Sequence, residues 1–129
     1  MPLLRFDLIE GRSDAELKTL LDASHDAMLE AFKVPVRDRY QIVHEHKASR
    51  MVVEDTGLDI PRTGKVVMLQ VTSRPRTEDM KVNFYRLLCE KLEERCGIAP
   101  TDVMVNFIIN SDADWSFGRG RAQFLTGEL

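Results

Sequence analysis

The sequence predicts an α/β (α+β) protein in which tandem β-α-β repeats form a four-stranded mixed sheet with two helices on one face. The first observation behind this prediction is that the spacing of apolar residues changes from strand to helix to strand in each half of the chain. The second is an approximate internal repeat with an offset of 64 residues, which places Ser13 on Thr77 and Asp38 on Asp102. Because a β-α-β crossover joins parallel strands, each half should contribute one parallel pair.

The first half begins with a mostly apolar strand over residues 2–9 and a turn at Gly11-Arg12. Ser13 and Glu16 then fit a capping box at the start of a helix. This helix carries one apolar stripe, broken only by the small polar Ser24 and formed by Leu17, Leu20, Leu21, Met28, Ala31 and Phe32. Pro35 is expected to end the helix.

A second short strand is predicted over residues 40–46. Residues 47–64 are polar and rich in turn-forming residues, so we expect a long loop here, with one further strand over residues 51–53. The next strand, residues 66–73, is uncharged after Lys65 and rich in β-branched residues, as expected of a buried strand.

The second half repeats the pattern. Thr77 should cap a helix that buries Met80, Phe84, Leu87, Leu88 and Leu92 and ends at Gly97. Residues 103–109 form the last predicted strand, and the remaining tail contains a tight turn at residues 118–120.

Length and composition indicate one domain over residues 1–129, with pseudo-repeats at about 2–63 and 66–110 and a tail over 111–129. The net charge of −3 argues against nucleic-acid binding, and no apolar run is long enough to cross a membrane. The start of the chain lacks the basic and apolar segments of a signal peptide, so a cytoplasmic location is expected. Cys89 and Cys96 form no metal or redox motif and should be reduced thiols.

The candidate site is centred on Arg74 and Arg76, which follow the strand over residues 66–73. In extended chain, two side chains spaced by two residues project to one face, and two guanidinium groups can hold one carboxylate or phosphate. If the first strands of the two repeats pair antiparallel, Pro2 lies beside these arginines, and Asp38 returns to the same edge. On residue type alone, two arginines at a strand end are more often a solvated rim, and Asp38 is more often a cap for the turn after Pro35.

Pro2 has chemistry of its own if Met1 is removed. The exposed secondary amine can add to a carbonyl and form an iminium ion, or it can act as a proton donor or acceptor. A chain that keeps Met1 holds the Pro2 nitrogen in an amide and should be inactive. A Met-Pro start is, however, also common for processing reasons alone.

Three segments carry a resemblance to known proteins, namely residues 2–12 (PLLRFDLIEGR), 73–76 (SRPR) and 110–121 (NSDADWSFGRGR). They resemble the tautomerase superfamily and, within it, the malonate semialdehyde decarboxylases. The resemblance spans nearly the whole chain. It implies a homotrimer in which Pro2, Asp38, Arg74 and Arg76 are catalytic and both arginines also bind substrate. The implied apolar wall of the substrate pocket consists of Trp115, Phe117, Phe124 and Leu129.

The resemblance favours decarboxylation of malonate semialdehyde, a small carboxylate substrate, to acetaldehyde and CO2. Two alternatives stay open: a tautomerase, hydratase or dehalogenase acting on small unsaturated 2-oxo or 3-halo acids, and a non-catalytic, cytokine-like ligand-binding trimer. None of these needs a metal or an organic cofactor. His44 and His46 have a spacing sometimes used for metals but no third ligand nearby, so they are interpreted as polar strand residues. The helix-free face of the sheet is expected to be largely apolar, which predicts an oligomer.

Overall fold

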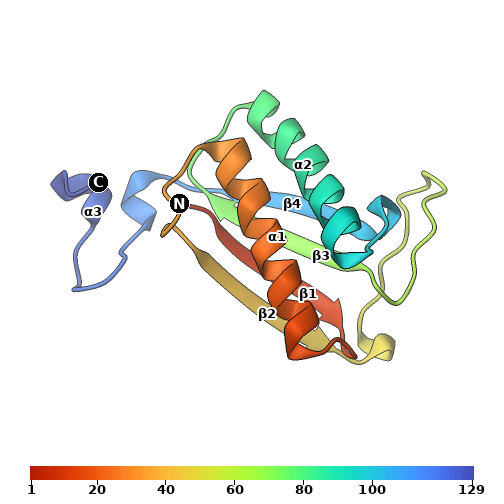
Figure 1. Cartoon of the computed structure of the whole chain (residues 1–129). Coiled ribbons are helices and arrows are strands. Elements are labelled where there is room, and N and C mark those ends of the chain that lie inside the picture. The colour runs from red at the N-terminus through yellow and green to blue at the C-terminus, as the bar shows by residue number, and fades with distance from the viewer.

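The computed structural model describes all residues from Met1 to Leu129. Two β-α-β units follow one another along the chain, and both long helices cover the same face of one sheet (Figure 1). The first unit comprises β1 (Leu3–Ile9), α1 (Asp14–Phe32) and β2 (Tyr40–His46). The second comprises β3 (Val67–Ser73), α2 (Glu78–Cys96) and β4 (Val103–Ile109), and the short helix α3 (Gln123–Thr126) lies in the tail. The predicted fold class is therefore confirmed.

Local side-chain chemistry fixes where the two long helices begin. Ser13 Oγ accepts a hydrogen bond from the Glu16 amide, and the Ser13 amide donates to the Glu16 carboxylate, so the predicted capping box is present. Thr77 Oγ1 likewise accepts from the Met80 amide at the start of α2. The end of α1 differs from the prediction, because Lys33 adopts the left-handed conformation and ends the helix two residues before Pro35.

The strand order is β2-β1-β3-β4, with the two outer pairs parallel and the central pair antiparallel. Leu3 faces Thr72 in the antiparallel pair, so the start of β1 lies beside the end of β3. Leu3 also faces Tyr40 in the parallel pair, which brings the start of β2 to the same edge. Three chain segments that are distant in sequence therefore meet where β1 begins.

The core lies between the sheet and the two helices. Alternate residues of β1 and β3 are buried, and the largest fully buried side chains include Phe6, Leu69 and Phe84. Ser24 on α1 is fully buried among them, and its hydroxyl group has no hydrogen-bond partner. No helix combines the length and the apolar character that a membrane crossing requires.

Two expectations about this fold are wrong. Residues 51–53 form no strand, because the chain leaves the sheet after a 3-10 turn at Ala48–Arg50 and has no neighbouring strand to pair with (Figure 1). The helix-free face of the sheet is also not largely apolar. Exposed Ile42, Met104 and Ile108 share it with polar groups such as the paired side chains of Asp7 and His46.

Candidate active site

The candidate site lies at the edge where β1 begins, as the antiparallel pairing requires. Met1 precedes Pro2 in the structure, so the Pro2 nitrogen belongs to an amide and the free amine is that of Met1. Pro2 itself is buried. The Met1 amino nitrogen lies 3.1 Å from Oδ2 of Asp38, so the chain terminus and this carboxylate form an ion pair.

Asp38 lies on the irregular segment between α1 and β2 and is only 6% exposed. Its carboxylate accepts no hydrogen bond from any other residue of the protein, apart from its contact with the terminal amine. Its repeat mate Asp102 is different, since it accepts hydrogen bonds from both the amide and the hydroxyl group of Thr63. Asp102 therefore serves the fold, whereas the oxygens of Asp38 remain available at the site.

The electrostatic environment of the terminal amine is set by four effects. Burial lowers the pKa of this amine below its usual value, while the negative charge of Asp38 raises it. The positive charges of Arg76 and Arg74 lower it further. An amine with a lowered pKa has a larger neutral fraction near pH 7, and the neutral form is the nucleophile and the proton acceptor.

Arg74 extends past the end of β3 and is held by two contacts. Its Nη1 donates to Oδ1 of Asp112 at 3.0 Å, and its guanidinium group lies 3.9 Å from the centre of the Phe124 ring. Its Nε is buried and has no hydrogen-bond partner. This buried donor is thus left for a ligand.

Arg76 is held in a similar way. Its Nε donates to the hydroxyl group of Ser73 at 3.1 Å, and its guanidinium group lies 5.2 Å from the Phe32 ring centre. Burial and the charge of Arg74 lower its pKa below the usual value for arginine. Its Nη2 is buried without a partner, and a buried unpaired donor is costly unless a ligand completes it.

The tail adjoins this edge and supplies aromatic rings. Phe117 packs against the other three rings here: it stacks on Trp115 at 5.5 Å, contacts Phe124 edge-on at 5.4 Å and lies 5.9 Å from Tyr40. Trp115 Nε1 donates to Oδ1 of Asn110, which fixes the Trp115 ring. The predicted aromatic residues therefore form one cluster at the site.

A pocket of about 390 Å³ opens beside the terminal amine. Of the residues predicted from sequence, Asp38, Phe117 and Leu129 line it, whereas Trp115 and Phe124 support Phe117 from behind. Arg74 and Arg76 do not line this pocket, although both act on the amine.

The sequence analysis did not identify five residues that line the pocket, namely Pro35, Arg37, Tyr40, Gln123 and Glu128. Tyr40 could have been found, because a parallel partner for the first strand places the start of that partner beside Pro2. Gln123 and Glu128 reach the pocket only because the tail contacts this edge, and no local sequence pattern indicates this.

Comparison with known proteins shows similarity to tautomerases along the chain. A family profile described as "Tautomerase enzyme" matches residues 38–118, and a second profile with the same description matches residues 2–59. The probable tautomerase YrdN of Bacillus subtilis (strain 168) is 60% identical over 129 residues, which covers all of both chains.

Solved structures extend the comparison. A crystal structure of malonate semialdehyde decarboxylase has a TM-score of 0.97 and 61% identity and covers 98% of each chain. A structure of the FG41 malonate semialdehyde decarboxylase, inhibited by 3-bromopropiolate, has a TM-score of 0.94 and 39% identity, with 98% of this chain and 97% of that chain covered. A fused 4-OT described as a symmetric trimer shares the fold, with a TM-score of 0.78 and 22% identity over 97% of this chain and 98% of its own. Because one profile matches more than half of the chain and a relative matches it from end to end, this protein belongs to the tautomerase superfamily.

Proposed function

We propose that this protein is a decarboxylase that converts malonate semialdehyde to acetaldehyde and CO2. The observation that carries the proposal is the site itself: the chain terminus, here the Met1 amine, lies beside a buried, otherwise unpaired carboxylate and near two arginines that each keep an unpaired buried donor. The 61% identity to a malonate semialdehyde decarboxylase over nearly the full length supports the choice of substrate.

The proposed roles follow from the demands of the reaction. Arg74 and Arg76 bind the substrate carboxylate and orient the carbon–carbon bond that breaks toward the π system of the neighbouring carbonyl. The electron pair of that bond then flows into the carbonyl group, which the Pro2 amine activates either as an iminium ion or by donating a proton. CO2 leaves, and the carbon atom that carried it takes up a proton and becomes the methyl group. Acetaldehyde is then released, by hydrolysis where an iminium ion has formed.

Asp38 and the aromatic wall affect the charged groups of the reaction, namely the amine and the departing carboxylate. The carboxylate of Asp38 stabilises the cationic form of the amine, or it orients a water molecule. Phe117, with Trp115 stacked on it, excludes water from the departing carboxylate, which favours its loss as a neutral gas.

Removal of Met1 is part of this proposal. With Met1 present, Pro2 has neither a proton nor a usable lone pair, and the Met1 amine occupies the position next to Asp38. The active form is therefore the chain that begins with Pro2.

Tautomerisation of a small 2-oxo acid is the second candidate. The curated relative at 60% identity is called a probable tautomerase, and the same amine and arginines can move a proton between carbon and oxygen. In that reaction the carboxylate is retained, so product analysis separates the two activities.

Homotrimeric assembly is likewise proposed. The resemblance implies it, and the exposed side chains of Ile42, Met104 and Ile108 on the helix-free face of the sheet support contact with further subunits.

The test compares two preparations whose first residue is established by intact mass, one that begins with Pro2 and one that keeps Met1. Each is incubated with malonate semialdehyde, and acetaldehyde is measured. We expect release of acetaldehyde only from the chain that begins with Pro2. Equal activity in a sample that carries Met1 throughout would rule out the amine mechanism, and enolisation of a 2-oxo acid without decarboxylation by the processed chain would favour the second candidate.

A further inference from the structure

The Asp38 carboxylate is not held in place by hydrogen bonds of its own. No side chain or backbone group of the protein donates a hydrogen bond to either carboxylate oxygen, so nothing but the terminal amine holds the charged end of this residue. The only hydrogen bond local to the turn joins the Asp38 amide to the Pro35 carbonyl oxygen at 2.9 Å. The location of the carboxylate must therefore be set by the backbone of the segment between α1 and β2.

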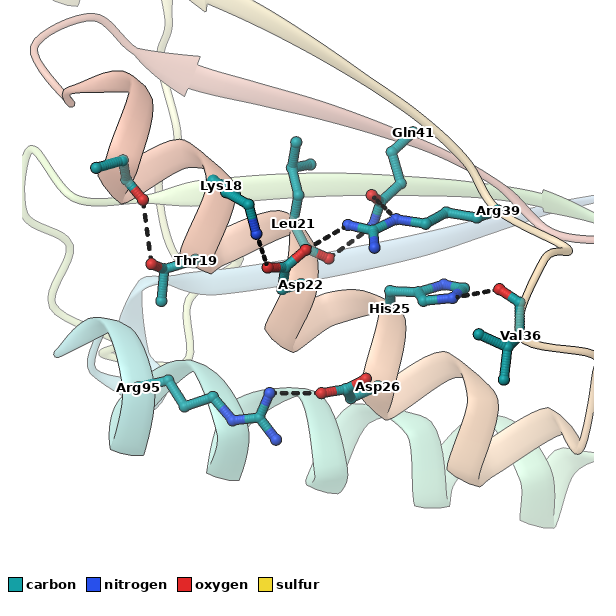
Figure 2. A network of polar contacts seen from close by, with 11 residues as sticks. Lys18, Thr19, Leu21, Asp22, His25, Asp26, Val36, Arg39, Gln41 and Arg95 are labelled. Carbon is teal, nitrogen blue, oxygen red and sulfur yellow. Dashed lines mark hydrogen bonds and ion pairs between the residues drawn. The ribbon is translucent and has the colours of Figure 1, made fainter.

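His25 of α1 contacts this segment two residues before Asp38. Its Nε2 lies 2.8 Å from the carbonyl oxygen of Val36, and because a carbonyl oxygen only accepts, Nε2 carries the hydrogen and donates it (Figure 2). The ring is 4% exposed, and its other nitrogen, Nδ1, is buried without a partner. A buried imidazole that leaves half of its hydrogen-bonding capacity unused costs stability. The contribution of a histidine at this buried position is therefore its single hydrogen bond to the Val36 carbonyl oxygen.

A second attachment lies on the other side of Asp38. Arg39 Nη2 donates to Asp22 of α1 at 2.8 Å, and its Nε donates to Oε1 of Gln41 at 2.8 Å (Figure 2). The Gln41 amide group in turn donates to the Leu21 carbonyl oxygen of α1 at 2.7 Å. Hydrogen bonds from Lys18 and Arg39 lower the pKa of Asp22 to about 2, so this carboxylate stays charged at neutral pH.

The two attachments differ in strength. Arg39 and Asp22 are both more than a third exposed, and exposed ion pairs contribute little to stability. The bond from His25 is buried, where a hydrogen bond is worth more and its loss costs more. His25 is therefore the attachment that matters most for the location of Asp38.

We propose that His25 is a positioning residue of the active site, which fixes the Val36 carbonyl group and thereby holds the Asp38 carboxylate next to the terminal amine. This proposal rests on one part of the proposed function, namely that Asp38 acts on the terminal amine. His25 itself touches neither the amine nor the pocket.

The test uses three variants of His25 and one matched control. Gln places an amide nitrogen where Nε2 lies and can donate to Val36, Asn is too short to reach it, and Leu has no donor. Ser24→Ala is the control, since Ser24 is the neighbouring residue of the same helix, is equally buried and makes no hydrogen bond.

The first readout is the pKa of the Met1 amine in the chain that keeps Met1, taken from the pH dependence of its acylation. Because burial lowers this pKa and Asp38 raises it, a displaced carboxylate should leave it lower in His25→Asn and His25→Leu than in the unchanged protein. His25→Gln and Ser24→Ala should match the unchanged protein. This readout needs no substrate, so it decides on His25 even if the protein proves not to be a decarboxylase.

The second readout is turnover of malonate semialdehyde by the chain that begins with Pro2. We expect kcat to fall about tenfold in His25→Asn, which corresponds to the loss of one hydrogen bond, with KM within about twofold because the arginines are untouched. His25→Gln should recover most of the loss. If His25→Leu does not fold, the comparison of Asn with Gln carries the test. Equal amine pKa values in Asn, Gln and control variants would overturn the proposal, as would a His25→Gln variant that is as impaired as His25→Asn.

Discussion

At the scale of single residues, the two aspartates at matching positions of the repeat illustrate how tertiary contacts assign roles. Both follow a proline by two or three residues and both are buried. Thr63 satisfies Asp102 with two hydrogen bonds, whereas Asp38 is left facing a terminal amine. Burying an ionised carboxylate without hydrogen bonds is unfavourable, and such groups are concentrated at functional sites.

Arg74 and Arg76 are each expected to be needed for turnover of a carboxylate substrate. Replacing Arg74 or Arg76 with alanine should lower kcat/KM for a carboxylate substrate by at least about tenfold, since a hydrogen bond to a charged group is worth about 1.5–3 kcal/mol. Steady-state kinetics of the two variants measure the effect. Arg50→Ala is the matched control, because Arg50 is exposed and makes no ion pair. Near-normal kcat/KM in both variants would remove the arginines from the mechanism.

At the scale of elements, the tail after β4 is a cluster held together largely by its own contacts. The Gln123 side chain accepts from the Phe117 amide and donates to the Gly118 carbonyl oxygen, and Arg121 pairs with Glu128. The tail reaches the body of the protein through the Arg74 pair with Asp112 and through rings that contact Arg74 and Tyr40. The tail therefore adds to the site more than to the core.

Deleting residues 122–129 tests this separation. The free energy of unfolding should change by no more than about 2 kcal/mol, because the deleted residues include no buried one. Activity should drop by about tenfold or more, since Arg74 loses the Phe124 ring beneath its guanidinium group, a contact worth about 0.5–2 kcal/mol, and the pocket loses Leu129. Urea unfolding measures the free energy of unfolding, and steady-state kinetics on the same preparation measure the activity. A variant that is strongly destabilised would show that the tail belongs to the core.

At the scale of the whole molecule, the sheet has one face covered by α1 and α2 and one face without helices (Figure 1). The uncovered face mixes apolar and polar side chains rather than being uniformly apolar. Interfaces between subunits commonly have this composition, with apolar residues beside hydrogen-bonding groups.

We expect sedimentation to give a species of three 14.8 kDa chains at micromolar concentration. Ile108→Lys places a charge on the uncovered face and should shift the protein toward monomer. Val52→Lys, at an exposed position in the loop after β2, should leave assembly unchanged. A stable monomer of the unchanged protein would refute the assembly, and equal behaviour of the two variants would place the interface elsewhere.

The sequence by itself determined the elements, and it predicted the edge where the site lies on condition that the two first strands pair antiparallel. Apolar periodicity and the caps at Ser13 and Thr77 act within a few residues, so they indicate strands and helices directly. Antiparallel pairing of the two first strands then brings Pro2, Arg74 and Arg76 to one edge.

Only the tertiary structure decided what surrounds that edge. It gave Asp38 and Asp102 different partners, joined His25 to Val36 and placed Phe117 of the tail against Tyr40. These contacts reach beyond the one or two helical turns that a local pattern covers. Residues 51–53 likewise have a strand-like composition but find no strand to pair with. Local sequence fixes backbone conformation over one or two turns, whereas a contact between distant residues depends on how the whole chain packs, which no short pattern records.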